Sequence, residues 1–82
     1  MTVTEGALPE VTRLDARGLK CPMPIVKTAQ AIKVLTPGQL LEVVATDPGS
    51  VADFAAWSRS TGNELVEQSA EGGEYRFVLR RK

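Results

Sequence analysis

Residues 22–45 read PMPIVKTAQAIKVLTPGQLLEVVA, a helix pattern followed at once by a strand pattern. From Pro22 to Leu35 the apolar residues fall close to helical spacing with polar residues between them, which predicts an amphipathic helix. Pro37-Gly38 ends that helix. The run from Leu40 to Ala45, rich in leucine and β-branched residues, predicts a buried strand.

The flanking sequence continues this alternation of strands and helices. Val11 to Asp15 is short enough for a first strand. Asp47-Pro48 predicts the start of a second helix, with Asp47 as its helix cap and Pro48 in its first turn. On this helix Phe54 belongs to the apolar stripe, and Trp57 is expected to lie off it.

The C-terminal third predicts a hairpin. Gly62-Asn63 ends the second helix, and the runs Glu64 to Ser69 and Glu74 to Leu79 flank the turn Glu71-Gly72-Gly73. Right-handed crossovers then place both helices on one face of the sheet. The predicted fold class is an α/β (α+β) two-layer sandwich of order β-α-β-α-β-β, a four-stranded mixed sheet with two helices on one face.

The chain of 82 residues is short enough for one domain, which we expect to span residues 11–82. Residues 1–10 lack a hydrophobic period and are expected to form a flexible N-terminal arm. No apolar run is long enough to span a bilayer, and the first residues do not resemble a signal peptide. We therefore expect a cytoplasmic monomer without membrane contact.

Cysteine and histidine usage limits the chemistry. One cysteine cannot form an internal disulfide, and with no histidine a metal site has almost no ligands. A core this small also leaves little room for a large cofactor. We expect no metal and no cofactor, and we expect any chemistry to take place at the surface.

The net charge of zero conceals an uneven distribution. Residues 13–33 contain five basic residues and one acidic residue, whereas residues 34–75 contain seven acidic residues and one basic residue. The sequence around the cysteine is therefore electropositive. Two interpretations stay open, a solvated charged surface and a face that docks a partner or attracts an anion.

Cys21 lies where the first helix is expected to begin, as its N-cap or first residue. The positive potential of a helix N-terminus, with Arg17 and Lys20 nearby, predicts a lowered pKa for this thiol. With Cys21 as N-cap, Pro22 and Pro24 occupy the first and third helical positions. The prolines leave few free N–H donors, so the helix start is a poor phosphate site, and they hold the sulfur in one direction.

The commonest role of a free cysteine is that of a small buried hydrophobe. The polar neighbours Arg17 and Lys20 favour an exposed thiol instead. No histidine can serve as a base, and no acid or lysine is identifiably placed as its substitute, so a self-sufficient nucleophilic enzyme is disfavoured. An activated thiol without acid–base partners suits transfer of sulfur between thiols, which needs little beyond access and a suitable pKa.

The motif LDARGLKCPMP at residues 14–24 resembles the signature of the TusA/SirA family of sulfur carriers. TDPG at residues 46–49 and YRFVLR at residues 75–80 also match the family pattern. The resemblance implies that Cys21 accepts sulfur as a persulfide from a cysteine desulfurase or rhodanese. It further implies delivery to an acceptor protein in tRNA thiolation, molybdenum-cofactor supply or sulfur oxidation.

This interpretation describes a sulfurtransferase-type carrier rather than a self-sufficient enzyme. Its positioning residues are Gly18, Pro22 and Pro24 of the motif. The residues expected to contact the donor and acceptor proteins flank the thiol on predicted polar positions or lie beside it: Arg17, Lys20, Met23 and Lys27.

Two positions depart from the family pattern. Met23 stands where members of the tRNA-thiolation branch often have glutamate, and Ser58 lies near where many relatives have a second cysteine. The pathway stays open for this reason. One alternative function is a thiol redox sensor, in which Cys21 is oxidised to a sulfenic acid.

Another alternative is a nucleic-acid-binding regulatory module. The family fold resembles the C-terminal domain of a translation initiation factor, and the chain ends in Arg80-Arg81-Lys82. Balanced charge and few aromatic residues argue against this alternative, and direct nucleic-acid binding is not expected.

Overall fold

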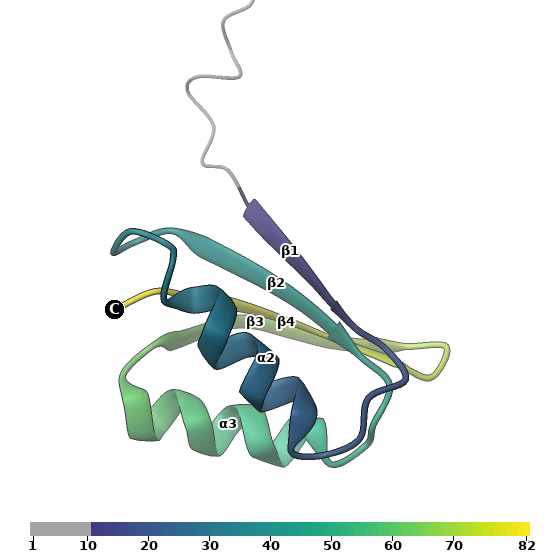
Figure 1. The fold of residues 1–82 in the computed structure, drawn as a ribbon. Coiled ribbons are helices and arrows are strands. Elements are labelled where there is room, and N and C mark those ends of the chain that lie inside the picture. Colours follow the sequence, from purple (N-terminus) through teal and green to yellow (C-terminus); the bar gives the residue numbers. More distant parts are fainter. Residues whose placement is uncertain (1–10) are drawn as a thin grey trace, which may run out of the picture.

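The computed structural model describes residues 11–82, and its helices and strands follow the predicted order (Figure 1). The elements are β1 (Val11–Ala16), α2 (Met23–Ile32), β2 (Leu40–Ala45), α3 (Ser50–Thr61), β3 (Glu64–Glu71) and β4 (Glu74–Arg80). The expectation of an arm over residues 1–10 lies outside the described residues. Within residues 11–82, no helix is long and apolar enough to cross a membrane.

The first helix is shorter than predicted at both of its ends. It begins at Met23, and it ends at Ile32 rather than Leu35. The N–H groups of Val34 and Leu35 each bond to the carbonyl three residues earlier, 3.4 and 3.2 Å away. Such bonds tighten the chain into turns, so the apolar period continues beyond the last α-helical residue.

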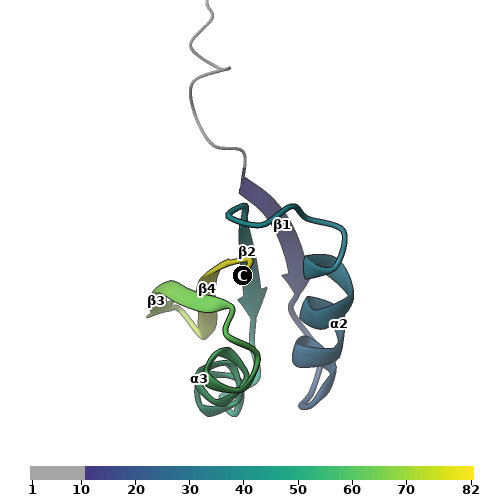
Figure 2. The same ribbon diagram turned by 90° about the vertical axis from the view of Figure 1, so that its left-hand side faces the viewer.

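The four strands form one mixed sheet in the order β1-β2-β4-β3. β1 and β2 are parallel, and β4 is antiparallel to both of its neighbours, β2 and β3. Both helices cover the same face of this sheet, as predicted (Figures 1 and 2). Because β1 and β2 are parallel, the loops that follow them, β1–α2 and β2–α3, leave the sheet at the same edge.

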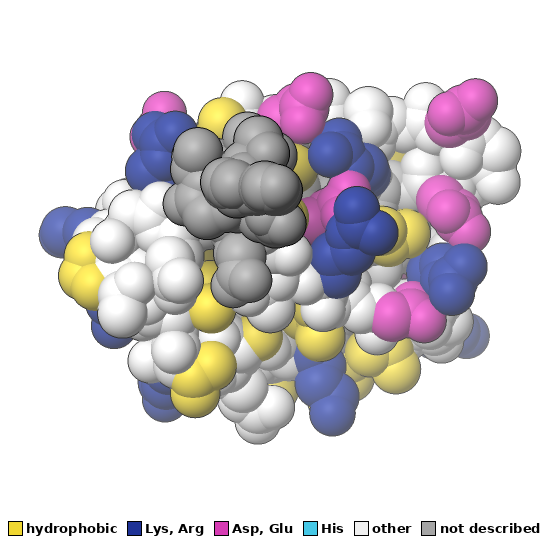
Figure 3. All heavy atoms as spheres, turned by 90° about the horizontal axis from the view of Figure 1, so that it is seen from above, with side chains coloured by type: hydrophobic (Ala, Val, Ile, Leu, Met, Phe, Trp, Pro, Cys, Tyr) yellow, Lys and Arg dark blue, Asp and Glu magenta, His cyan; other side chains and the backbone are white. Residues whose placement is uncertain are grey.

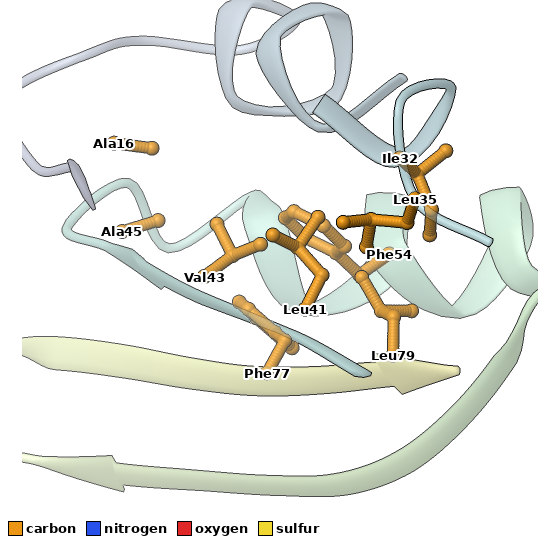
Figure 4. Close-up of a cluster of buried hydrophobic side chains, with 9 residues drawn as sticks. All are labelled: Ala16, Ile32, Leu35, Leu41, Val43, Ala45, Phe54, Phe77 and Leu79. Carbon is orange, nitrogen blue, oxygen red and sulfur yellow. The ribbon is translucent and has the colours of Figure 1, made fainter. Parts of the chain in front are cut away.

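The core lies between the sheet and the two helices (Figure 4). Alternate residues of β2 point into it, as the period of two in a strand requires. Phe54 of α3 stacks on Phe77 of β4 with ring centroids 4.3 Å apart. The buried cluster consists of Ala16, Ile32, Leu35, Leu41, Val43, Ala45, Phe54, Phe77 and Leu79.

The prediction that Trp57 lies off the apolar stripe of the second helix is wrong. Trp57 is half-buried and packs against the core cluster. α3 lies over both β3 and β4, so its inward surface is wider than a single stripe. Val51, which the stripe includes by spacing, is exposed in the first turn.

The other face of the sheet carries ion pairs instead of helices. Four side chains, Arg13, Glu42, Arg76 and Glu67, form what we call the arginine–glutamate ladder across the sheet. Glu42 contacts Arg13 at 2.9 Å and also contacts Arg76, which lies 3.1 Å from Glu67. Figure 3 shows basic and acidic side chains interspersed on this face.

Candidate functional site

Cys21 lies in the loop between β1 and α2, and its side chain is exposed. The expected helix start is shifted by one residue, because Pro22 is the N-cap and Met23 is the first helical residue. Pro24 is therefore the second helical residue rather than the third, and it is buried. The Cys21–Pro22 peptide bond is cis.

The backbone N–H groups of Cys21 and Met23 are both used inside the protein. The N–H of Cys21 donates to Asp47 Oδ2 at 2.8 Å, and the N–H of Met23 donates to the Lys20 carbonyl at 2.8 Å. The prolines were expected to leave few donors free at this helix start, and these two are bonded within the protein. The helix start therefore offers a phosphate little to bind, and it offers the sulfur little positive potential.

Two hydrogen bonds join the β1–α2 loop to the β2–α3 loop. Gly18, with a φ of 81°, donates its N–H to Thr46 Oγ1 at 2.8 Å. The second bond is the one from Cys21 to Asp47. A residue with a Cβ would strain the positive φ, so Gly18 is suited to the positioning role that the motif assigns to it. The two loops border an open hollow of about 580 Å³ that includes Cys21.

Asp47 does not cap the second helix as predicted. α3 begins at Ser50 with Gly49 as N-cap, and no side chain among residues 11–82 makes a cap hydrogen bond to it. The Asp47 carboxylate accepts the Cys21 N–H instead, and its other oxygen lies 3.4 Å from the Gly49 N–H. Asp47 therefore bonds to the residue just before the first helix, because the two loops meet at one edge of the sheet.

Asp53 is the site residue that the sequence did not identify. It lies in the first turn of α3, and the Cys21 thiol donates a hydrogen bond to its Oδ2. The predicted order of strands and helices was the only feature of the sequence that could have pointed to Asp53. Parallel β1 and β2 bring the starts of both helices to one edge, and Asp53 is the acid in the first turn of the second of them.

The predicted lowering of the Cys21 pKa is wrong. Its hydrogen bond to Asp53 raises the pKa to about 11, and local desolvation of the thiol and the charges of Asp53 and Asp47 act in the same direction. The Asp53 carboxylate lies against the sulfur and Asp47 accepts the Cys21 N–H, whereas the N–H of Met23 is bonded to the Lys20 carbonyl. Because the thiolate is the form that reacts with oxidants and with sulfur donors alike, this geometry slows both reactions and does not discriminate between the carrier and the redox-sensor alternative.

Arg17 does not contribute free positive charge to the thiol. Its guanidinium bonds to both carboxylate oxygens of Asp15 and lies 3.4 Å from Glu74. These contacts raise the pKa of Arg17, and the Arg17 hydrogen bonds lower the pKa of Asp15 to about 2. Lys20, Met23 and Lys27 are exposed.

Ser58 and the C-terminal basic residues have structural partners. Ser58 Oγ donates to the Asn63 carbonyl at 2.6 Å and accepts the Leu65 N–H at 3.2 Å, which joins α3 to β3. Arg80 pairs with Glu64, and Arg81 donates to the Ile32 carbonyl. These engaged arginines weaken the case for a nucleic-acid interface at the end of the chain.

Comparisons with known proteins agree with the motif. A family model described as "Sulfurtransferase TusA" matches residues 12–81. The sulfur carrier protein TusA of Allochromatium vinosum is 48% identical over 68 residues, which are 83% of this chain and 90% of that protein. The sulfur carrier protein TusA of Pseudomonas aeruginosa is 44% identical over 69 residues, covering 84% and 87% of the two chains.

A solved structure shows the same fold. The crystal structure of a SirA-like protein from Desulfitobacterium hafniense superposes with a TM-score of 0.73 at 18% sequence identity. The match covers 87% of this chain and 96% of that chain. The likeness therefore includes the whole two-layer arrangement of sheet and helices.

Proposed function

The chain belongs to the TusA family of sulfur carrier proteins, and from this premise we propose that it carries sulfur as a persulfide on Cys21. The observation that carries the proposal is the exposed Cys21 thiol, the only one in the chain, on the β1–α2 loop, which hydrogen bonds join to the β2–α3 loop. An exposed, fixed thiol is accessible to the sulfur of another protein.

Loading is a thiol exchange with balanced bonds. The Cys21 thiolate attacks the terminal sulfur of a donor persulfide, a new S–S bond forms at Sγ, and the donor's own S–S bond breaks. The bonding electrons of the broken bond stay on the donor sulfur, which becomes a thiolate and takes up a proton. Delivery repeats the same exchange with an acceptor thiolate as the attacking group.

The donor in this proposal is a cysteine desulfurase or a rhodanese. The acceptor serves tRNA thiolation, molybdenum-cofactor supply or sulfur oxidation. Met23 supports no choice among these pathways, although its exposed side chain, two residues after Cys21 in the sequence, is an apolar contact for a partner in the proposal. The remaining partner contacts in the proposal are Arg17, Lys20 and Lys27, which surround the thiol in the sequence and are exposed.

The test is intact-mass analysis after incubation with a cysteine desulfurase and cysteine, or with a rhodanese and thiosulfate. The wild-type chain should gain the mass of one sulfur atom, and a reducing agent should remove it. Cys21→Ser should gain none, and Ser58→Ala, which keeps the thiol, serves as the matched control and should load. Equal loading of the wild type and Cys21→Ser would refute the proposal.

A further inference from the structure

Two carboxylates beside the thiol have no basic partner in the described part of the chain. Asp53 accepts the hydrogen bond of the Cys21 thiol, and Asp47 accepts the Cys21 N–H. None of the ion pairs formed within residues 11–82 includes either residue. The sulfur therefore lies in a locally negative environment, although the surrounding sequence is rich in basic residues.

The other charged groups near the site do not neutralise the charges of Asp47 and Asp53. Arg17, on the same loop as Cys21, is held by Asp15 and Glu74. Lys20 is exposed and forms no ion pair within residues 11–82. The first turn of α2 contains no acidic residue, and the first charged residue of that helix is Lys27. On α3 the only basic residue, Arg59, lies in the last turn.

We propose that Asp53 is a latch that keeps the empty Cys21 thiol protonated, and that a partner protein releases the latch by bringing an arginine or lysine side chain to Asp53. The inference rests on the proposed function, because it concerns how the same thiol becomes reactive. It assigns to the partner a cationic side chain placed beside its own reactive sulfur.

The release follows from charge and hydrogen bonding. A guanidinium or ammonium group that binds Asp53 takes over the carboxylate that accepts the thiol hydrogen bond, and it neutralises the nearest negative charge. The thiol proton then leaves to water, and the thiolate attacks the terminal sulfur of the donor. Without a partner, the thiol stays protonated at neutral pH and reacts slowly with other electrophiles.

The same carboxylate acts differently once sulfur is loaded. A persulfide ionises more readily than a thiol, so the loaded sulfur carries negative charge. Like charges in contact repel, so Asp53 and Asp47 turn the terminal sulfur away from α3 and toward solvent. One residue thus protects the empty carrier and presents the loaded one.

Small thiol reagents of different charge can stand in for the partner. Methanethiosulfonates transfer their thioalkyl group to a thiolate and release methanesulfinate, and they are available with a cationic aminoethyl, a neutral methyl or an anionic sulfonatoethyl group. We expect the cationic reagent to modify Cys21 at least about tenfold faster than the neutral one, relative to a free small thiol. The anionic reagent should be the slowest.

Asp53→Asn removes the charge with little change in shape. At pH 8 it should raise the rate of alkylation by neutral iodoacetamide about ten- to a hundredfold, because each unit by which the pKa falls gives tenfold more thiolate. The preference for the cationic reagent should disappear. Glu71→Gln, which removes an exposed charge at the β3–β4 turn, is the matched control and should change neither measurement.

Equal rates in the wild type and Asp53→Asn, or equal rates with all three reagents, would overturn the proposal. Circular dichroism establishes that each variant is folded, and Asp53→Ser replaces Asp53→Asn if the latter is not. These rates do not depend on persulfide loading. A failure of loading with an intact latch refutes the proposed function alone, and the reverse result refutes the latch alone.

Discussion

On the open face of the sheet, each glutamate of the arginine–glutamate ladder contacts an arginine, whereas at the start of the two helices Asp47 and Asp53 face a backbone N–H and a thiol. The ladder lies over the strands that build the core, and its charges neutralise one another. The carboxylates beside the sulfur are left to act on Cys21. The difference indicates that paired acids maintain the fold here and unpaired acids tune the chemistry.

The ladder should show the largest effect on stability. Glu42 is shared by Arg13 and Arg76, and its side chain is only 12% exposed. Glu42→Ala leaves both arginines without this partner, so we expect a loss of about 1–3 kcal/mol in the free energy of unfolding. Urea denaturation monitored by circular dichroism measures the loss.

Glu64→Ala is the matched control for the ladder. Glu64 pairs with Arg80 in an exposed position, and such pairs contribute about 0–1 kcal/mol. Iodoacetamide alkylation of Cys21 should be the same in both variants and the wild type. A changed alkylation rate in Glu42→Ala would show that the two regions are not independent.

The exposed lysines on either side of Cys21 in the sequence should affect transfer and leave stability unchanged. Lys20→Glu combined with Lys27→Glu reverses two exposed charges near the thiol, so we expect sulfur transfer from a desulfurase to slow about three- to tenfold. Lys33→Glu, at the other end of the same helix, should leave the rate unchanged. An unchanged rate in the double variant would refute the docking face.

The sequence predicted the fold well because local patterns carry it. The leucine and β-branched residues of Leu40–Ala45, the helical period after Pro22 and the glycines of the β3–β4 turn each constrain a single element. Asp53 could not be found in this way, because its contact with Cys21 depends on two helix starts meeting across separate loops. Trp57 was misplaced because a helix over two strands buries more than one stripe.

The prediction for the thiol pKa is wrong because this pKa, too, depends on contacts between separate loops. The helix start and the nearby basic residues are visible in the sequence, and both favour the thiolate. In the structure, however, Asp47 accepts the Cys21 N–H, and Arg17 forms an ion pair with Asp15. Only the tertiary arrangement shows that Arg17 and the Cys21 N–H are engaged elsewhere and that a carboxylate lies against the sulfur.

At alkaline pH, the stability of the fold should depend on the protonation of the Cys21 thiol. The folded protein raises the Cys21 pKa from 9.0 to about 11, so between these values the native state keeps a proton that the unfolded chain has lost. Stability from this group is present below pH 9 and falls as pH rises toward 11. Urea midpoints of the wild type should fall more steeply over this range than those of Cys21→Ser. Parallel curves would contradict the raised pKa.

The smallest expected effect is on the stability at acidic pH, and it comes from the ion pair between Asp15 and Arg17. Arg17 lowers the pKa of Asp15 from 3.8 to about 2, so the native state binds this proton less readily than the unfolded chain. The stabilisation is present above about pH 4 and disappears as pH falls through 2. Asp15→Asn keeps an oxygen that can accept the Arg17 N–H and removes the charge. Its stability should differ slightly from that of the wild type at pH 7 and low salt. The difference should shrink as pH falls through 2, and it should also shrink at high salt because the pair is exposed. A difference that persists unchanged at pH 2 would mean that the carboxylate acts through packing rather than through its charge.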